Sequence, residues 1–295
     1  MTVEGLHCKE LTQTLDMLRG QKKRDYWKML VLKLHTLNEW FSAQGLHTAL
    51  VRVEPTTHSR LAAHVAWSAS RLSQSPIHRL MALCTQPGLE GQTQELRDMG
   101  FEVHTLWTGG VQAALASATG FLSESSRDSQ LLKEQATACV LNVLREKNPA
   151  LATLGHIDRD QAAYLGAFSQ AVEGACDVQI FTDLYRSEVF EMGSSTKLAE
   201  PLSEEPLILT VSVGTQSICS DEMELFSRLA DLPWEIASDI QNQWGPKAKR
   251  RFMEIQQGVS RIRDFRQRIY RGCSPSTHLD FRPPVPGGWT YKTWN

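Results

Sequence analysis

The chain alternates between short apolar runs and longer segments in which apolar residues recur every three or four positions. The longer repeat is that of an amphipathic helix, and short runs rich in β-branched residues are typical of buried strands. The clearest helix is expected over residues 23–43, before the stop signal of Gly45. Its apolar stripe, which we expect to face the core, consists of Trp27, Leu30, Leu34, Leu37 and Phe41.

The apolar runs predict five strands, and helical patterns separate them. The strands are expected at residues 48–53, 79–84, 101–107, 177–181 and 207–213. The intervening helices are expected mainly at residues 59–73, 89–99, 110–147 and 158–173. Strands that alternate with helices form right-handed β-α-β units and a parallel sheet. The run 207–213 is the most apolar and β-branched, so we expect it at the centre of the sheet.

These elements predict an α/β fold with a mostly parallel, Rossmann-like, doubly wound sheet of about five strands flanked by helices, followed by a helical C-terminal extension. Residues 1–220 are expected to form the α/β core domain with its N-terminal helices. Residues 221–272 would form the helical extension, and residues 273–295, rich in proline and glycine, an extended tail. A chain of 295 residues can bury a sizeable core without disulfides or metals.

Charge and cysteine content narrow the class of protein. The formal net charge of -2 argues against binding nucleic acid or membranes through bulk charge. The six cysteines are widely spaced and contain no C-x-x-C pair, which fits free thiols in a reducing compartment. No run approaches 18 apolar residues, and the N-terminus is charged, so neither a membrane span nor a signal peptide is expected. We therefore expect a cytoplasmic protein without a membrane partner, and the oligomeric state is left open.

Polar loops follow the predicted strands, where ligands of open parallel sheets bind. Two of these loops contain glycine turns, at residues 109–110 and 214–215, whose backbone N–H groups could approach an anion. The alternative is that the loops are ordinary turns and helix N-caps, which use the same residue types. The candidate substrate-binding residues are Thr57, His58, Gly109, Gly110, Arg186, Gly214 and Thr215.

A dense group of chemically active side chains follows the predicted strand 177–181. Together with Glu54, which follows the first strand, Asp183, Tyr185 and Glu188 are the candidate catalytic residues. A carboxylate whose pKa is raised by burial could act as a general base, and the phenol could donate a proton. Arg186 could hold a carboxylate or phosphate. A salt-bridged helix start would explain the same residues without catalysis.

Common catalytic and cofactor motifs are absent from the sequence. It contains no G-x-x-x-x-G-K-[ST], G-x-G-x-x-G or G-x-S-x-G, so no P-loop, dinucleotide fingerprint or hydrolase elbow is expected. His58 and His64 are six residues apart and would lie on different faces of a helix, and the pair His156 and Asp158 lacks further partners. We therefore predict no metal site and no cofactor.

A basic helix is expected near the C-terminus, within residues 247–271. Its apolar stripe would pack on the body and leave cationic side chains facing outward, where they could contact phosphates. The alternative is a solvated helix whose arginines pair with acidic residues such as Glu200, Glu204 and Glu205. The candidate polyanion-binding residues are Lys247, Lys249, Arg250, Arg251, Arg261, Arg263 and Arg266.

A Rossmann-like sheet with a basic helix is similar, in fold alone, to class I aminoacyl-tRNA synthetases and cyclodipeptide synthases. The sequence has neither H-I-G-H nor K-M-S-K-S, nor a glycine-flanked serine after the first strand. This likeness therefore carries little information about function.

The pattern as a whole favours a transferase-type enzyme acting on a phosphate-bearing or RNA-linked substrate, for example one like aminoacyl-tRNA. The small-molecule or carrier-bound substrate would enter a pocket at the strand ends, with RNA as a possible partner docked by the basic helix. One alternative is a non-catalytic interaction scaffold that uses the basic helix and the tail with Trp289 and Trp294. Another is a protein that binds a nucleotide or another small molecule.

Overall fold

The computed structural model describes residues 8–20, 24–85, 88–106, 110, 113–114, 117, 126–165, 176–198, 209–212, 215–269 and 277–278; it leaves out the side chains at 126–135, 164–165, 209–217 and 261–269. The helices and strands in these residues are, in chain order, α1 (Lys9–Gly20), α2 (Tyr26–Gln44), β1 (Thr48–Val53), α3 (Thr57–Ser70), β2 (Arg79–Cys84), α4 (Glu90–Asp98), β3 (Glu102–Thr105), α6 (Ser126–Lys147), β4 (Leu151–Asp158), α7 (Arg159–Leu165), β5 (Val178–Phe181), α8 (Arg186–Thr196), β6 (Leu209–Ser212), β7 (Thr215–Ile218), α9 (Ser220–Ala230), α10 (Trp234–Asn242), α11 (Pro246–Ile269) and β8 (Thr277–His278).

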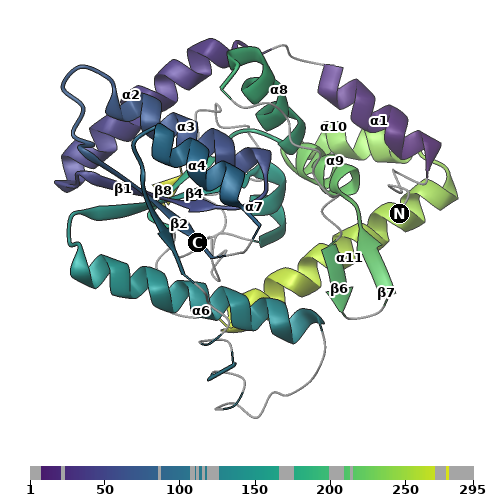
Figure 1. Ribbon diagram of the computed structural model, residues 1–295. Helices are drawn as coiled ribbons and strands as arrows, with labels where there is room; N and C mark the ends of the chain where they lie inside the picture. The colour runs from purple at the N-terminus through teal and green to yellow at the C-terminus, as the bar shows by residue number, and fades with distance from the viewer. Residues whose placement is uncertain are drawn as a thin grey trace.

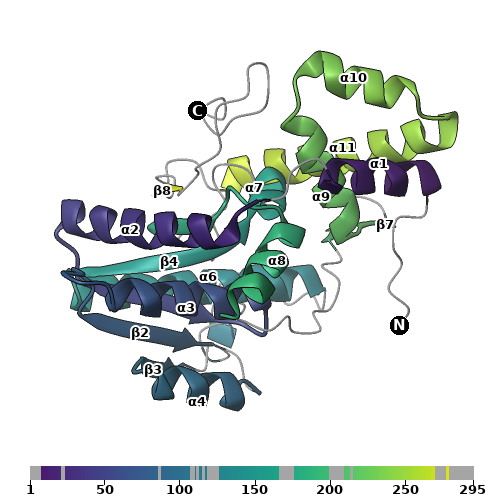
Figure 2. The ribbon, with the colours of Figure 1, turned by 90° about the horizontal axis from the view of Figure 1, so that it is seen from above.

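The main sheet is parallel and has the strand order β3-β2-β1-β4-β5, with the short β8 added beside β5. The chain moves outward from β1 to β2 and β3, then returns to place β4 on the other side of β1 (Figure 2). The order therefore reverses between β1 and β4, which makes this junction the topological switch point of the sheet. The predicted α/β class with a parallel, doubly wound sheet is confirmed.

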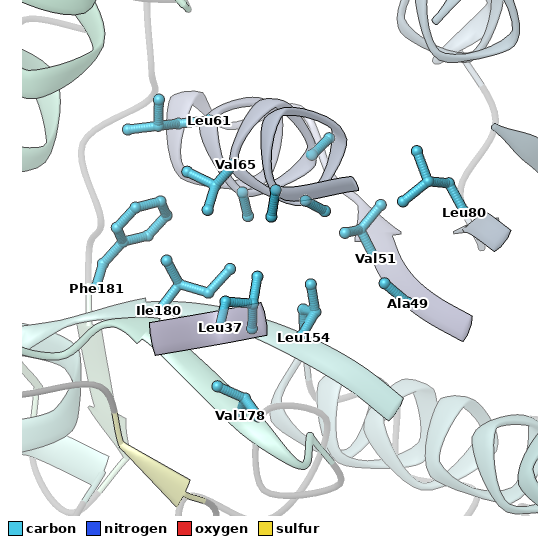
Figure 3. Packing of buried hydrophobic residues seen from close by; sticks show 14 of the residues in the cluster. Leu37, Ala49, Val51, Leu61, Val65, Leu80, Leu154, Val178, Ile180 and Phe181 are labelled. Carbon is cyan, nitrogen blue, oxygen red and sulfur yellow. The ribbon is translucent and has the colours of Figure 1, made fainter. Parts of the chain in front are cut away.

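Helices cover both faces of the sheet. Along β1, alternate residues point to opposite faces, so Val51 packs toward α2 and α3 whereas Leu50 packs with Leu141 of α6. Figure 1 shows α2 and α3 on one side of the sheet and α6 on the other. Figure 3 shows how Leu37 of α2 and Val65 of α3 meet the strand side chains in the larger core cluster. Burial of each such leucine or valine contributes roughly 1.5–3 kcal/mol.

Strand β4 lies at the centre of the sheet, between β1 and β5, and is buried along its whole length. The sequence pattern did not predict it, because Gly155 and His156 interrupt its apolar run. The glycine leaves room for the buried side chain of Gln179 on β5: a Cβ on Gly155 would come within 2.0 Å of Gln179 Oε1, so that side chain would have to move. In the sequence, Gly155 looked like a residue that ends a strand, whereas in the structure it allows two strands to pack closely.

The run 207–213 does not occupy the centre of the parallel sheet, so that prediction is wrong. Within it, β6 pairs with β7 in a separate antiparallel sheet. An apolar, β-branched run favours a strand but does not specify the strand with which it pairs. The central positions belong to β1 and β4 instead.

Helix α2 confirms the predicted stripe except at its first member. Trp27 is 55% exposed, whereas its neighbour Tyr26 is buried. The buried face also includes Lys33, a charged residue three positions after Leu30. The helix ends at Gly45, whose φ of 64° is the left-handed conformation that favours glycine.

Helices α1, α9, α10 and α11 form a second unit, which we call the helical group. Leu15 of α1 packs in one apolar cluster with Leu225 of α9 and Ile255 of α11, so the first described helix meets two helices from the last third of the chain. Figure 2 shows the helical group beyond the end of the sheet toward which the strand arrows point. Among the residues that the structure describes, no helix is both long and apolar enough to cross a membrane.

Candidate functional site

The carboxyl ends of β1, β4 and β5 carry a group of polar side chains that are buried or half-buried. Ligands of doubly wound folds bind at this edge, beside the switch point. Here β1 and β4 are neighbours, and Asp158 at the end of β4 pairs in register with Phe181 of β5. Residues from the three strand ends are therefore brought together although they are distant in the sequence.

Glu54 lies at the switch point itself, directly after β1. Its Oε1 accepts a hydrogen bond from Arg52 at 2.7 Å, and its Oε2 lies 3.0 Å from Nε2 of His156 on β4. The side chains of Arg52 and His156 are almost completely buried, whereas that of Glu54 is 27% exposed. Two buried partners therefore orient a carboxylate that solvent can reach. We call these three residues the strand-end cluster.

The loop between β1 and α3 is held by its own side chains. Thr56 caps α3 by accepting a hydrogen bond from the Ser59 N–H at 3.1 Å. The Ser59 hydroxyl accepts from the Glu54 N–H at 3.0 Å and donates to the Arg52 carbonyl at 2.7 Å. Pro55 has no N–H to offer. This loop therefore uses amide groups internally that a glycine-rich loop would present to a phosphate.

His58, in the first turn of α3, is fixed to the end of β4. Its Nε2 lies 2.9 Å from Oδ2 of Asp158, and its ring meets Phe190 edge-on with centroids 5.6 Å apart. Asp158 also caps α7, because its Oδ1 accepts from the Gln161 N–H at 2.7 Å. His58 and its neighbour Thr57 are both buried, so the structure places these two substrate-binding candidates inside the fold.

Asp183 is completely buried beyond the end of β5 and forms an ion pair with Lys33 of α2. Lys33 Nζ donates to Asp183 Oδ1 at 2.5 Å and to the carbonyl of Ile180 at 2.8 Å. Both side chains have no exposed surface. A buried ion pair stabilises a fold little relative to a pair of apolar side chains, but removing one partner leaves the other charge buried and uncompensated. This catalytic candidate therefore joins α2 to the sheet.

Tyr185 and Glu188 lie at the start of α8, facing the helical group. The Tyr185 hydroxyl donates to Asp231 at 2.7 Å, and the guanidinium of Arg228 lies 3.9 Å from the centre of the ring. Glu188 accepts from the Tyr185 N–H at 3.0 Å and pairs with Arg24 at 2.9 Å. Burial raises the pKa of Glu188 above its usual value, although Arg24 opposes this. The salt-bridged helix start that we considered as an alternative is present.

A buried carboxyl group, Asp160, lies between the sheet and the helical group. Its Oδ2 accepts from the N–H of Arg186 at 2.9 Å, at the first turn of α8. Burial raises its pKa well above the ordinary value, and the charges of Asp158 and Glu224 raise it further. The Arg186 guanidinium lies over the Phe190 ring, 5.4 Å from its centre. Asp160 was not a candidate from the sequence.

The glycine turns do not take the positions expected for them. Gly109 and Gly214 lie outside the described residues, and Gly110 is exposed. Thr215 begins β7 of the separate hairpin, so it does not follow a central strand of the parallel sheet. The prediction that residues 214–215 lie at the carboxyl edge of that sheet is wrong, because it depended on the misplaced strand 207–213.

Among the described side chains of the basic helix α11, that of Arg251 forms ion pairs. Arg251 donates to both carboxylate oxygens of the buried Glu222, at 2.6 and 2.7 Å, and so holds α11 against α9. Lys247, Lys249 and Arg250 are exposed. The side chains of Arg261, Arg263 and Arg266, and the residues Glu200, Glu204 and Glu205, lie outside what the structure describes. Polyanion binding by this set stays a prediction.

The sequence missed the partners that fix the site: Lys33, Asp160 and Arg228. Lys33 had a signal, because it occupies a position on the apolar stripe of α2 where a charged side chain needs a buried partner. His156 and Asp158 were examined only as metal ligands. Within the described part of the chain, no group of three or more His, Cys, Asp or Glu residues is placed to hold a metal ion.

Comparisons with known proteins identify the fold. Neither the protein-family models nor the curated proteins contain a match. Among solved structures, the NH3-dependent NAD synthetase from Campylobacter jejuni has a TM-score of 0.57 and 13% identity, over 83% of this chain and 96% of that one. The NAD+ synthetase from Burkholderia pseudomallei has a TM-score of 0.55 and 15% identity, over 84% and 94%. The NMN synthetase from Francisella tularensis has a TM-score of 0.51 and 15% identity, over 60% of this chain and 72% of that one.

These comparisons overturn the functional prediction made from the sequence. The structural neighbours are synthetases of NAD and NMN, and not transferases or tRNA-binding proteins, so the predicted transferase with an RNA-linked substrate is wrong. That prediction relied on a cationic docking face, whereas Arg251 serves the packing of α11 on α9. At these low identities the likeness concerns the fold, and the chain has the α/β architecture of NAD synthetase-type structures.

Proposed function

We propose that this chain binds a small molecule over the carboxyl ends of β1 and β4, with the Glu54 carboxylate as a principal polar contact. The observation that carries the proposal is the strand-end cluster. It lies where the strand order reverses, and the position beyond the strand ends at such a reversal is the usual ligand site of doubly wound folds. Glu54 is exposed enough to meet a ligand there.

The strand-end cluster also has the preorganisation that binding requires. Arg52 and His156 are buried and hold opposite oxygens of the Glu54 carboxylate. A side chain that is already fixed loses little conformational freedom when a ligand arrives, so more of the interaction energy appears as affinity. The neighbouring loop is fixed as well, through the contact between His58 and Asp158.

The fold neighbours indicate which compounds to test first. Their names describe synthetases of NAD+ and of NMN, both small nucleotide-type molecules. A thermal-shift screen of the purified chain would start with NAD+ and NMN and continue with nucleotides, nucleosides, sugars and amino acids. A ligand at one hundred times its Kd adds about 2.7 kcal/mol to the stability of the folded state, which such a screen detects.

The chain offers a matched control for Glu54. Glu102, the first residue of β3, also pairs with one arginine and one histidine, Arg79 at 2.5 Å and His104 at 2.9 Å, and its side chain is 45% exposed at the opposite edge of the sheet. We expect a compound that raises the Tm of the wild type and of Glu102→Gln but not that of Glu54→Gln. The proposal fails if every stabilising compound acts equally on both variants, or if the library contains no stabilising compound.

A further inference from the structure

The loop before α3 lacks the glycines that are usual in phosphate-binding loops. Phosphates bind at helix N-termini through several backbone N–H groups, commonly in loops with glycine. Residues 54–59, Glu-Pro-Thr-Thr-His-Ser, contain no glycine. Pro55 has no N–H, and the N–H groups of Glu54 and Ser59 are bound to Ser59 Oγ and Thr56 Oγ1. A phosphate here would also meet the negative charge of Glu54.

The charge of Glu54 is already balanced. Arg52 lies 2.7 Å from Oε1, so a cationic ligand group would gain from the carboxylate but would approach the guanidinium closely. A neutral hydrogen-bond donor avoids this repulsion and still benefits from a charged acceptor. The strand-end cluster therefore favours hydroxyl groups over both phosphate and ammonium groups.

Hydroxyl pairs fit a carboxylate well. A carboxylate has two oxygens with about four acceptor positions, and Arg52 and His156 each lie on one oxygen. Two adjacent hydroxyls of one ligand can donate to the two oxygens together. In dinucleotide-binding doubly wound folds, an acidic side chain hydrogen-bonds the 2′-hydroxyl of the ribose.

We propose that Glu54 accepts hydrogen bonds from the vicinal diol of a ribose, and that the ligand binds without a phosphate at the start of α3. This inference rests on the proposed function, because it names the ligand chemistry of the same site. The shared chemistry is the diol, which a nucleoside, a nucleotide or a free sugar can supply. Phosphates of a nucleotide would then point away from the β1–α3 loop.

The test is calorimetric titration of the wild-type chain with four probes. Adenosine carries the diol and 2′,3′-dideoxyadenosine does not; ATP adds the phosphates and D-ribose removes the base. We expect adenosine to bind about tenfold or more tightly than the dideoxy compound, since each lost hydrogen bond to a charged group weakens binding strongly. ATP should bind within about threefold of adenosine, because the β1–α3 loop has no glycine to let its backbone approach a phosphate and carries the negative charge of Glu54. Binding by D-ribose but not adenosine would identify a free sugar as the source of the diol.

Variants connect the diol to Glu54. In Glu54→Gln the affinity for adenosine should fall about tenfold and the preference over the dideoxy compound should disappear, because the charged acceptor is lost. In Glu102→Gln both should match the wild type. The wild-type comparison of adenosine with its dideoxy analogue requires no variant, so it tests the need for the diol even if Glu54→Gln fails to fold.

The outcomes separate this inference from the proposed function. Equal binding of adenosine and 2′,3′-dideoxyadenosine overturns the diol inference. ATP binding more than threefold tighter than adenosine overturns the inference that no phosphate binds at the start of α3. If a compound without a diol binds in a Glu54-dependent manner, the proposed function stands and the diol inference fails. If no probe and no compound of the wider screen binds in a Glu54-dependent manner, both fail.

Discussion

Replacing Asp160 by asparagine should stabilise this protein as the pH rises above about 4. Asp160 is 4% exposed, and one of its oxygens, Oδ1, has no hydrogen-bond partner among the described residues. The other oxygen accepts the Arg186 N–H, a contact that the asparagine oxygen can keep. The substitution therefore removes an ionisable group with little change in shape.

The expected direction follows from the pKa of Asp160. Burial raises it well above the ordinary value of 3.8, the carboxylates of Asp158 on β4 and Glu224 on α9 raise it further, and the Arg186 N–H and Arg228 oppose the change. The folded chain thus keeps its proton at a pH where the unfolded chain has lost it. Because the folded state binds more protons, its stability falls as the pH rises from about 4 toward the raised pKa.

The pH dependence of the free energy of unfolding follows from the titration of one proton. Within that window the free energy of unfolding of the wild type should fall by about 1.4 kcal/mol per pH unit relative to Asp160→Asn. Each kcal/mol corresponds to roughly 2–4 °C in Tm for a domain of about 150–250 residues. Above the folded pKa of Asp160 the difference should become constant, since the group is then ionised in both states.

Urea unfolding followed by circular dichroism at several pH values between 4 and 8 measures this difference. Asp98→Asn is the control, because Asp98 lies exposed at the end of α4. The free energy of unfolding should depend on pH in the same way in the wild type and in Asp98→Asn. That of Asp160→Asn should rise relative to both as the pH increases. A constant difference between Asp160→Asn and the wild type across the range would refute the argument that Asp160 is held neutral.

Two further substitutions test the packing that positions the site. Gly155→Ala should lower the free energy of unfolding by about 1–3 kcal/mol, because the new Cβ would overlap the Gln179 side chain. Gly91→Ala in α4, where a Cβ meets nothing within 4 Å, should be neutral or stabilising. Equal urea midpoints for the two variants would contradict this reasoning. Lys33→Met should cost about 3–5 kcal/mol by leaving Asp183 buried without its partner, and adding Asp183→Leu should recover much of the loss. A double variant as unstable as the single one would argue against the ion pair as the cause.

The fold was predictable where one local pattern decided the structure. Strands 48–53 and 79–84 were predicted with the bounds of β1 and β2, because apolar runs between turn signals leave few alternatives. Strand β4 was missed because Gly155 interrupts its apolar run, and this glycine accommodates Gln179, a residue on another strand. The sequence cannot show such a contact, and the same ignorance of pairing placed residues 207–213 in the wrong sheet.

The site was predictable only in part. Polar residues after an apolar strand led to Glu54, His58 and Asp183, and all three lie at the carboxyl edge of the sheet. Their partners come from elsewhere: Lys33 is separated from Asp183 by 150 residues, and His156 from Glu54 by 102. Which candidates are buried in ion pairs and which can be reached by a ligand depends on these partners, and so required the structure.

Hydrogen–deuterium exchange with and without the most stabilising compound of the screen tests the central claim most directly. If the ligand lies over the strand-end cluster, backbone amides within residues 52–59 and 154–158 should exchange more slowly in its presence. The corresponding segments of Glu54→Gln should show no slowing, and those of Glu102→Gln should behave as in the wild type. Slowing confined to α11, or absent from both strand-end segments, would contradict the proposed ligand site.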